Sequence, residues 1–182
     1  MTPQTAILMS HYSRWMNQRI CEAAGELDAA ELLADKGAFF GSILGTLNHL
    51  AVGDTVWLHR FARHPYRFEA LAGLSEFERP SSLRQTIASD LASLADYRLR
   101  LDELIARWVA EIRSEHLAAA VPYSTMAGLP FCKPFGPLLQ HFFNHQTHHR
   151  GQVTTLLYQS GVDVGVTDLL ELIPGTADQP RS

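Results

Sequence analysis

Residues 137–160, PLLQHFFNHQTHHRGQVTTLLYQS, combine the apolar spacing of an α-helix with a cluster of four histidines. At about 100° per residue, one side of such a helix is lined by Leu138, Phe142, Val153 and Leu156. Gly161 follows at a position where helices commonly end in the left-handed conformation. The pattern therefore predicts an amphipathic helix that begins at Pro134 or Pro137 and ends at Ser160.

Two of the four histidines share the buried side of this predicted helix. His149 falls within the apolar stripe and His145 lies at its edge, about 40° away. Residues four apart lie one above the other on a helix, so these two imidazoles can bind one metal ion. His141 and His148 lie further round, and we expect them at a pocket rim or on the surface. Two ligands do not make a stable site, so a third must come from elsewhere in the chain.

The same periodicity predicts three further helices, over residues 3–27, 38–63 and 83–112. Ser82 and Gln85 have the spacing of a capping box at the start of the third. Together with the histidine-bearing segment, this makes four long amphipathic helices.

The connections between these helices differ in length and content. Residues 64–80 and 116–133 show no sustained period. VPYSTMAGLPF, residues 121–131, has only a weak hairpin signal. A short helical turn is expected over 167–173. The connections after the second and third helices are therefore long, and a simple up-down-up-down order is not required.

Four amphipathic helices without a convincing strand indicate an all-α protein, and the architecture that suits them is a four-helix bundle. The chain has 182 residues, a length that suits one compact domain. We assign residues 1–175 to this single domain and residues 176–182 to a polar C-terminal tail.

The composition argues against several classes of protein. The formal net charge is −4 and no run of Lys or Arg occurs, which argues against nucleic-acid binding. No apolar run approaches the roughly 18 residues of a membrane span, and the N-terminus does not resemble a signal peptide. Cys21 and Cys132, the latter expected in a loop, are interpreted as reduced thiols. We therefore expect a cytoplasmic protein with neither nucleic acid nor membrane as a partner.

A third candidate ligand is His49, which lies beside the apolar stripe of the second predicted helix. Gly45 and Gly53 lie one turn away on either side, although glycine costs a helix about 1 kcal/mol relative to Ala. One interpretation is open volume over the imidazole for a water or substrate; the other is close packing of two helices. With His145 and His149, three imidazoles with a vacant position would form a catalytic metal site. The alternative is that these histidines are hydrogen-bonded core residues.

Asp54 occupies the centre of the same apolar stripe, so its carboxylate needs a buried partner. We favour a hydrogen bond to Asn17, Arg14 or the Trp15 indole over a role in orienting a ligating histidine. Gln152 shares the histidine face and either lines the pocket or is simply a polar edge residue.

Taken together, three stretches resemble the DinB family of DinB/YfiT-like metalloenzymes: YSRWMNQR (12–19), GSILGTLNHLAVGDTVWLHRF (41–61) and FNHQTHHRGQVTTLLYQSGVDVGVTDLLEL (143–172). The last stretch is the most specific. The middle of the chain, residues 64–133, matches only loosely.

The resemblance implies more than the residues show by themselves. It implies a four-helix bundle in up-down-down-up order, often dimeric, so that a homodimer is expected. It also implies a divalent metal ion held by His49, His145 and His149. Some relatives resemble transferases or isomerases that use a low-molecular-weight thiol, and the family name refers to induction by DNA damage, a stress response.

We expect a metal-dependent enzyme whose ion activates water or a low-molecular-weight thiol for attack on a small electrophilic substrate. Zinc or nickel is the expected ion, although three imidazoles also suit copper and iron. Neither a Cys nor a Ser is placed to act as a protein nucleophile. Two alternatives remain open: a non-catalytic metal- or small-ligand-binding stress-response bundle, and an interaction module whose histidines bind nothing.

Overall fold

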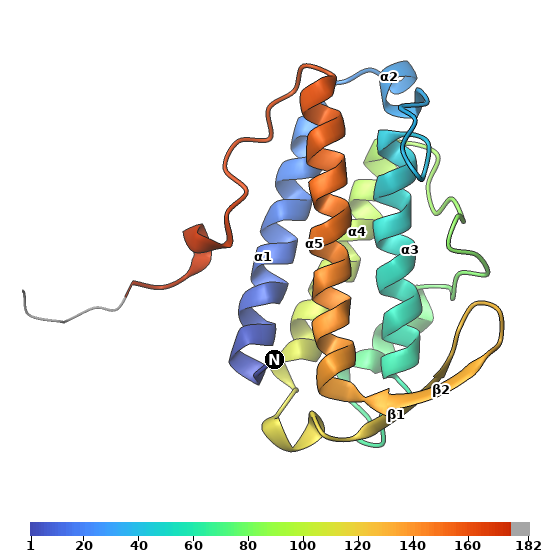
Figure 1. Ribbon diagram of the computed structural model, residues 1–182, viewed down its shortest axis with the longest axis vertical. Coiled ribbons are helices and arrows are strands. Elements are labelled where there is room, and N and C mark those ends of the chain that lie inside the picture. Colours follow the sequence, from blue (N-terminus) through green and yellow to red (C-terminus); the bar gives the residue numbers. More distant parts are fainter. Residues whose placement is uncertain (176–182) are drawn as a thin grey trace, which may run out of the picture.

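In the computed structural model, which describes residues 1–175, four long helices lie side by side (Figure 1). They are α1 (Pro3–Ala24), α3 (Ile43–Phe61), α4 (Leu91–Ala110) and α5 (Phe135–Gln159). The helix α1 packs against α4 and α5, and α3 packs against the same two helices. The expectation of a mostly helical protein with these four long helices is confirmed.

The shorter elements lie between and after the long helices. They are α2 (Ala29–Leu33), the 3-10 helices η1 (Ala70–Glu76), η2 (Ser114–His116) and η3 (Leu169–Leu172), and the strands β1 (Ala120–Ser124) and β2 (Pro130–Pro134). The element η3 matches the helical turn expected over 167–173, whereas the predicted tail 176–182 lies outside the described residues. Within the described chain, no helix has an apolar stretch long enough to cross a lipid bilayer.

An antiparallel hairpin corrects the all-α expectation. The strands β1 and β2 pair with Val121 opposite Lys133, and Gly128 in the connecting turn has a φ of 82° that favours glycine. The sequence signal is weak because every residue of β2 is exposed, so no apolar alternation marks it. Cys132 lies in β2 and not in a loop, with its thiol free.

The first two long helices are shorter than their periodicity predicts. The helix α1 ends at Ala24, three residues before the predicted end at 27. The helix α3 begins after Ser42, whose Oγ accepts a hydrogen bond from the Gly45 N–H at 3.0 Å. Gly41, with a φ of 78°, turns the chain just before this cap. The short helix α2, capped by Asp28, occupies the connection.

The third long helix begins at Leu91 and not at residue 83. Asp90 caps it, with its Oδ1 accepting a hydrogen bond from the Ser93 N–H at 2.8 Å. The predicted capping box of Ser82 and Gln85 is therefore wrong, because no helix starts there.

The side chain of Asn48 on α3 explains why the residues before α4 are not helical. Its Oδ1 accepts hydrogen bonds from the N–H groups of Ile87 and Ala88, at 2.7 and 3.1 Å. Its Nδ2 donates to the Ala88 carbonyl at 3.0 Å. These contacts engage backbone groups that a helix would need, so a tertiary contact overrides the local helical periodicity.

Buried apolar residues form two clusters, one toward each end of the long helices. One includes Phe61, Trp108, Phe135 and Phe142. The other includes Met16, Ile20, Leu44 and Leu157. Along α3, α4 and α5, the buried polar residues Asp54, Arg98 and Gln146 lie between the two clusters. The apolar ends therefore hold the helices together around a polar middle layer.

Candidate metal centre

Three imidazoles converge between α3 and α5. His49 comes from α3, His145 and His149 come from α5, and one nitrogen of each lies within 4.8 Å of the others. The Nε2 atoms of His49 and His145 are 3.3 Å apart. Two nitrogens bound to one tetrahedral zinc ion, each at about 2.0–2.1 Å, lie roughly 3.3 Å from each other. The separation therefore fits a shared metal ion, and the three histidines could hold one.

Hydrogen bonds to the outer nitrogens orient two of the three rings. The Nδ1 of His49 lies 3.0 Å from the Leu83 carbonyl oxygen, and the Nδ1 of His149 lies 2.7 Å from Oε1 of Gln152. Both oxygens can only accept, so each Nδ1 carries the proton and each Nε2 keeps its lone pair. Metal-binding histidines commonly have such an acceptor on the nitrogen that does not bind the ion.

Burial keeps the three imidazoles in the form that binds metals. It lowers the pKa of His49 to about 4 against the opposing effect of the Leu83 carbonyl, and neighbouring His149 lowers it further. It lowers the pKa of His145 to about 3, with further lowering by His149 and His49. The pKa of His149 is lowered in the same direction, again chiefly by burial. All three rings are therefore neutral at pH 7 and have lone pairs for coordination.

The two glycines beside His49 allow close approaches by other groups, and Gly45 also lines a cavity of about 150 Å³ together with His49. Phe40 stacks on the His49 ring, with centroids 3.7 Å apart and planes 16° from parallel. A Cβ at Gly45 would lie 2.3 Å from the Phe40 carbonyl oxygen, and a Cβ at Gly53 would lie 2.8 Å from Cε1 of His145. Gly45 thus admits the backbone that carries Phe40, and Gly53 admits a ring of the cluster itself.

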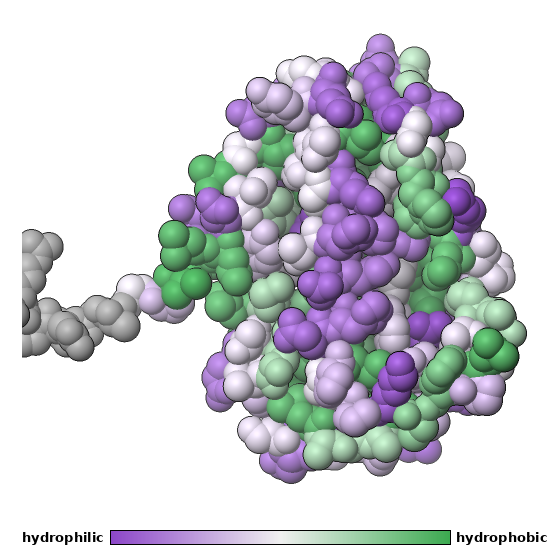
Figure 2. Space-filling view, viewed as in Figure 1, coloured by the Kyte–Doolittle hydropathy of each residue, from purple (hydrophilic) through white to green (hydrophobic). Residues whose placement is uncertain are grey.

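The remaining histidines of α5 lie outside the cluster, as the sequence predicts. His141 and His148 are exposed. Figure 2 shows hydrophilic residues gathered in a band over α5 on this face of the molecule. The His141 ring lies 6.0 Å from that of His145 and 5.1 Å from that of Trp57, so it borders the cluster toward the hairpin.

Asp54 belongs to a different polar centre from the histidines, and none of its predicted partners on α1 is its partner. Arg98 of α4 and Gln146 of α5 both donate hydrogen bonds to its Oδ2. Arg98 also donates to Asp102 at 2.8 Å. Asn17, one of the three candidates, donates instead to Asp102, at 3.1 Å from each carboxylate oxygen. The network thus links all four long helices.

A second arginine completes this network. The guanidinium of Arg150 donates to Oε1 of Gln146 at 2.9 Å and lies 5.1 Å from the Tyr12 ring centroid. Burial raises the pKa of Asp54 to about 6 although Arg98 acts in the opposite direction. Burial alone would lower the pKa of Arg98, but Asp102 and Asp54 raise it above its ordinary value. Two buried carboxylates therefore face two buried guanidinium groups.

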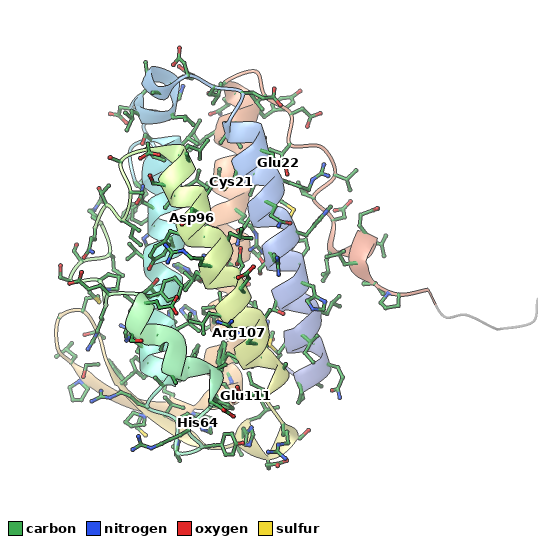
Figure 3. The ribbon with its side chains drawn as sticks, turned by 180° about the vertical axis from the view of Figure 1, so that it is seen from behind. Cys21, Glu22, His64, Asp96, Arg107 and Glu111 are labelled. Carbon is green, nitrogen blue, oxygen red and sulfur yellow. The ribbon has the colours of Figure 1, made fainter. Side chains whose placement is uncertain are left out.

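A further cavity, of about 290 Å³, opens between α1 and α4. It is lined in part by Cys21, Glu22 and Asp96, which Figure 3 shows from behind the view of Figure 1. Burial raises the pKa of the Cys21 thiol to about 11, which keeps it protonated and a poor nucleophile at pH 7. Within residues 1–175, the histidine cluster is the one group of three or more potential metal ligands. We therefore assign the candidate chemistry to the α3–α5 side.

Sequence reasoning missed several residues that support the cluster. The Leu83 carbonyl and the Phe40 ring leave no recognisable pattern, because their roles depend on loops folding against α3. Gln152 did leave a signal, since it follows His149 by three residues on the same helix face. Arg98 was missed because a single arginine on an amphipathic helix usually lies at the surface.

Comparison with known proteins identifies the family of the chain. The DinB family matches residues 1–181, and the chain therefore belongs to the DinB family. It is similar to Protein DinB of Bacillus subtilis strain 168, with 27% identity over 163 residues that cover 90% of each chain. No solved structure matches the chain.

Proposed function

We propose that this protein is a metal-dependent enzyme in which His49, His145 and His149 hold a divalent ion, with zinc or nickel expected. The ion would activate water or a low-molecular-weight thiol for attack on a small electrophilic molecule. The observation that carries the proposal is the convergence of three neutral imidazoles with their ligand nitrogens within 4.8 Å of one another.

The number of ligands supports a catalytic site over a structural one. Structural zinc sites normally have four protein ligands, whereas catalytic sites have three and leave a position for water or substrate. Among the residues described, no fourth His, Cys, Asp or Glu joins the cluster. This count favours an enzyme over the alternative of a non-catalytic metal-binding bundle.

The surrounding residues would orient the metal ligands, and the nucleophile would be a molecule that binds from solution. The Leu83 carbonyl and Gln152 orient two of the imidazoles, and the Phe40 ring shields one face of His49 from water. Cys21 lies in the α1–α4 cavity with a raised pKa, and Cys132 lies in β2. Neither thiol belongs to the cluster, which supports a nucleophile that enters from solution.

Metal analysis of untagged protein tests the site first. We expect one divalent ion per chain in wild-type protein and in His11→Ala, which alters an exposed histidine of α1. His145→Ala should lower zinc affinity by about 100-fold or more, because two imidazoles remain in place of three. Equal zinc binding by His145→Ala and wild-type protein would refute the assignment of the ligands.

A thiol-transfer screen with a generic electrophile tests the enzymatic part. The zinc- and nickel-loaded proteins should accelerate addition of a low-molecular-weight thiol or of water, and His145→Ala should lose that acceleration. Full turnover by His145→Ala would refute catalysis by the metal. Tight zinc binding combined with a large loss of folding stability on metal removal, and no turnover, would favour the non-catalytic alternative.

We include in this proposal an up-down-down-up four-helix bundle, a homodimer, a small-molecule substrate, cytoplasmic location and a role in stress response. The helix order is supported by the direction of the ribbons in Figure 1, where α1 and α5 rise and α3 and α4 descend. The remaining parts rest on the resemblance and on the sequence. Sedimentation of the untagged protein tests the dimer, and fractionation of cells tests the location.

A further inference from the structure

The structural elements around the histidine cluster are poor in acidic side chains. The helix α5, the residues 120–134 of the hairpin and the segment 83–89 contain no Asp or Glu. The helix α3 contains one, Asp54, and that carboxylate is buried against Arg98. The whole chain nevertheless has a formal net charge of −4, so its acidic residues lie mainly on other parts of the molecule.

One cation on this acid-poor side is Arg60, near the end of α3. Its guanidinium lies 4.5 Å from the ring centroid of Trp57 and 5.2 Å from that of Tyr123. In the part of the chain that the structure describes, it forms no ion pair, and its buried Nε has no hydrogen-bond partner. Two aromatic rings therefore hold a guanidinium whose charge no protein carboxylate neutralises.

Short ring contacts connect Arg60 to the histidine cluster. The Trp57 ring that carries the guanidinium is 5.1 Å from His141, and His141 is 6.0 Å from His145. Lys133 of β2 reaches the same region. Its Nζ lies 5.4 Å from the Phe131 ring centroid, and the Phe131 ring stacks on Tyr123, the second ring beside Arg60. Two rings, those of Trp57 and His141, therefore lie between Arg60 and the cluster.

A second arginine lies on the other side of the cluster. The guanidinium of Arg84 is 4.7 Å from the Phe39 ring centroid and 5.4 Å from that of Phe40, the ring that stacks on His49. A cavity of about 150 Å³ is lined by His49, Phe40 and Arg84 together. Within residues 1–175, Arg84 likewise has no ion-pair partner. The cluster thus lies between two guanidinium groups, each held against aromatic rings.

We propose that the molecule acted on at this site is a small organic anion, with Arg60 and Arg84 as the residues that recognise its negative groups. This inference rests on the metal-dependent function proposed above. Guanidinium groups match carboxylate, phosphate and sulfonate oxygens, and stacking on aromatic rings positions them before a ligand arrives. Because α5, the hairpin and the segment 83–89 carry no carboxylate, the potential along these elements favours an anion despite the negative net charge.

Titration with glutarate and with its uncharged analogue glutaramide tests this selectivity. The full chain, metal-free and zinc-loaded, is followed by ¹⁵N–¹H correlation spectra that include the arginine Nε–H signals. We expect glutarate to bind about fivefold to tenfold more tightly than glutaramide and to shift the signals of Arg60 and Arg84. Equal affinity for the two compounds, or unmoved arginine signals, would overturn the proposal.

Matched variants separate charge recognition from folding. Arg60→Gln and Arg84→Gln should each lower glutarate affinity about fivefold and leave glutaramide unchanged, whereas Arg60→Lys should retain part of the affinity. Arg14→Gln removes an arginine paired with Glu103 of α4 and should change neither. An equal loss in Arg14→Gln would mean that only net charge matters, and would refute the proposal.

Zinc binding by the same proteins distinguishes the two proposals. Both glutamine variants should still bind one zinc ion per chain, because neither arginine is a ligand. If wild-type protein binds no zinc, the metal-dependent function fails, while the titration of metal-free protein still decides whether the anion site exists. If zinc binds and glutarate shows no preference, the anion proposal alone fails.

Discussion

The histidine cluster and the Asp–Arg network occupy the same middle layer of the protein, but the buried polar groups of the two centres find their partners in different ways. His145 joins the cluster while the next residue, Gln146, donates a hydrogen bond to Asp54 in the network. Gly53 touches the His145 ring, and the next residue, Asp54, accepts from Arg98. Adjacent residues on α3 and α5 therefore contribute to two separate polar centres.

The two centres differ in whether the protein supplies their partners. In the network, Arg98 pairs with both Asp54 and Asp102, and the buried Arg150 binds Gln146 beside them, so two positive and two negative groups are buried together. In the cluster, three neutral imidazoles converge among the described residues, His49 and His149 with their Nε2 lone pairs free and His145 with its Nε2 3.3 Å from that of His49. Buried polar groups need partners: the charged groups of the network find theirs within the protein, whereas the three histidines could hold an external cation.

Removing the cation at the centre of the network should have the largest effect on folding. Arg98→Leu leaves Asp54 and Asp102 buried without it and should lower the free energy of unfolding by about 3–5 kcal/mol. Urea unfolding of metal-free protein at pH 7 measures the change. Arg100→Leu, which breaks an exposed pair with Asp96 on the same helix, should cost less than about 1 kcal/mol. Equal losses would show that the network does not stabilise the fold.

The loss in the free energy of unfolding caused by Arg98→Leu (the deficit) should become smaller as the pH is lowered. The pKa of Asp54 in the folded protein is raised from 3.8 to about 6, so its contribution to stability is present below about pH 4 and is lost as the pH rises through 6. Loss of Arg98 raises this pKa further. Protonation of Asp54 at low pH then removes a larger free-energy cost in the variant than in wild-type protein. Between pH 7 and pH 4.5 the deficit relative to wild type should fall by about 1 kcal/mol, because the wild-type carboxyl, with its pKa near 6, also becomes protonated over this range.

The same urea unfolding, repeated at each pH, provides the control for this prediction. The lowered pKa values of the clustered histidines give the opposite pH dependence, but they are common to both proteins and cancel in the difference. A deficit that stays constant with pH, as expected for Arg100→Leu, would contradict a buried carboxylate as its cause.

Gly53→Ala should weaken metal binding without weakening the fold. The new Cβ would lie 2.8 Å from Cε1 of His145, so the imidazole must move, and zinc affinity should fall on the order of 10- to 100-fold. Alanine in a helix is favoured by about 1 kcal/mol, which offsets the steric cost in unfolding experiments. Gly151→Ala on α5 has open space around its Cβ and should leave zinc affinity unchanged. An unchanged zinc affinity in Gly53→Ala would show that His145 is not a ligand of the metal.

The smallest effect is expected at the acceptor that orients His149. Gln152→Leu removes the oxygen 2.7 Å from Nδ1 and should lower zinc affinity about tenfold, the smaller end of such effects because water can replace the partly exposed amide. Gln152→Glu keeps an acceptor and should retain the affinity. Competition with a zinc-sensitive dye measures both, and equal losses in the two variants would refute an orienting role.

Much of the helical structure could be predicted because amphipathic periodicity is a local property of the chain. All four long helices appear where apolar residues recur at helical spacing, and Gly161, with a φ of 85°, follows α5 as expected. The prediction failed over residues 83–90, where Asn48 engages the backbone, and in β2, where exposure removes any alternation. Both failures arise from contacts or exposure that the local pattern does not contain.

The sequence by itself determined which faces of the helices are apolar and that His145 and His149 lie together on one of them, because both follow from helical geometry. Only the tertiary structure decided that His49 meets these two rings, that Phe40 covers it, and that Asp54 pairs with Arg98. A helical period specifies the direction of a side chain but not its neighbour on another helix. The partner depends on how the four helices pack, which is a property of the whole chain.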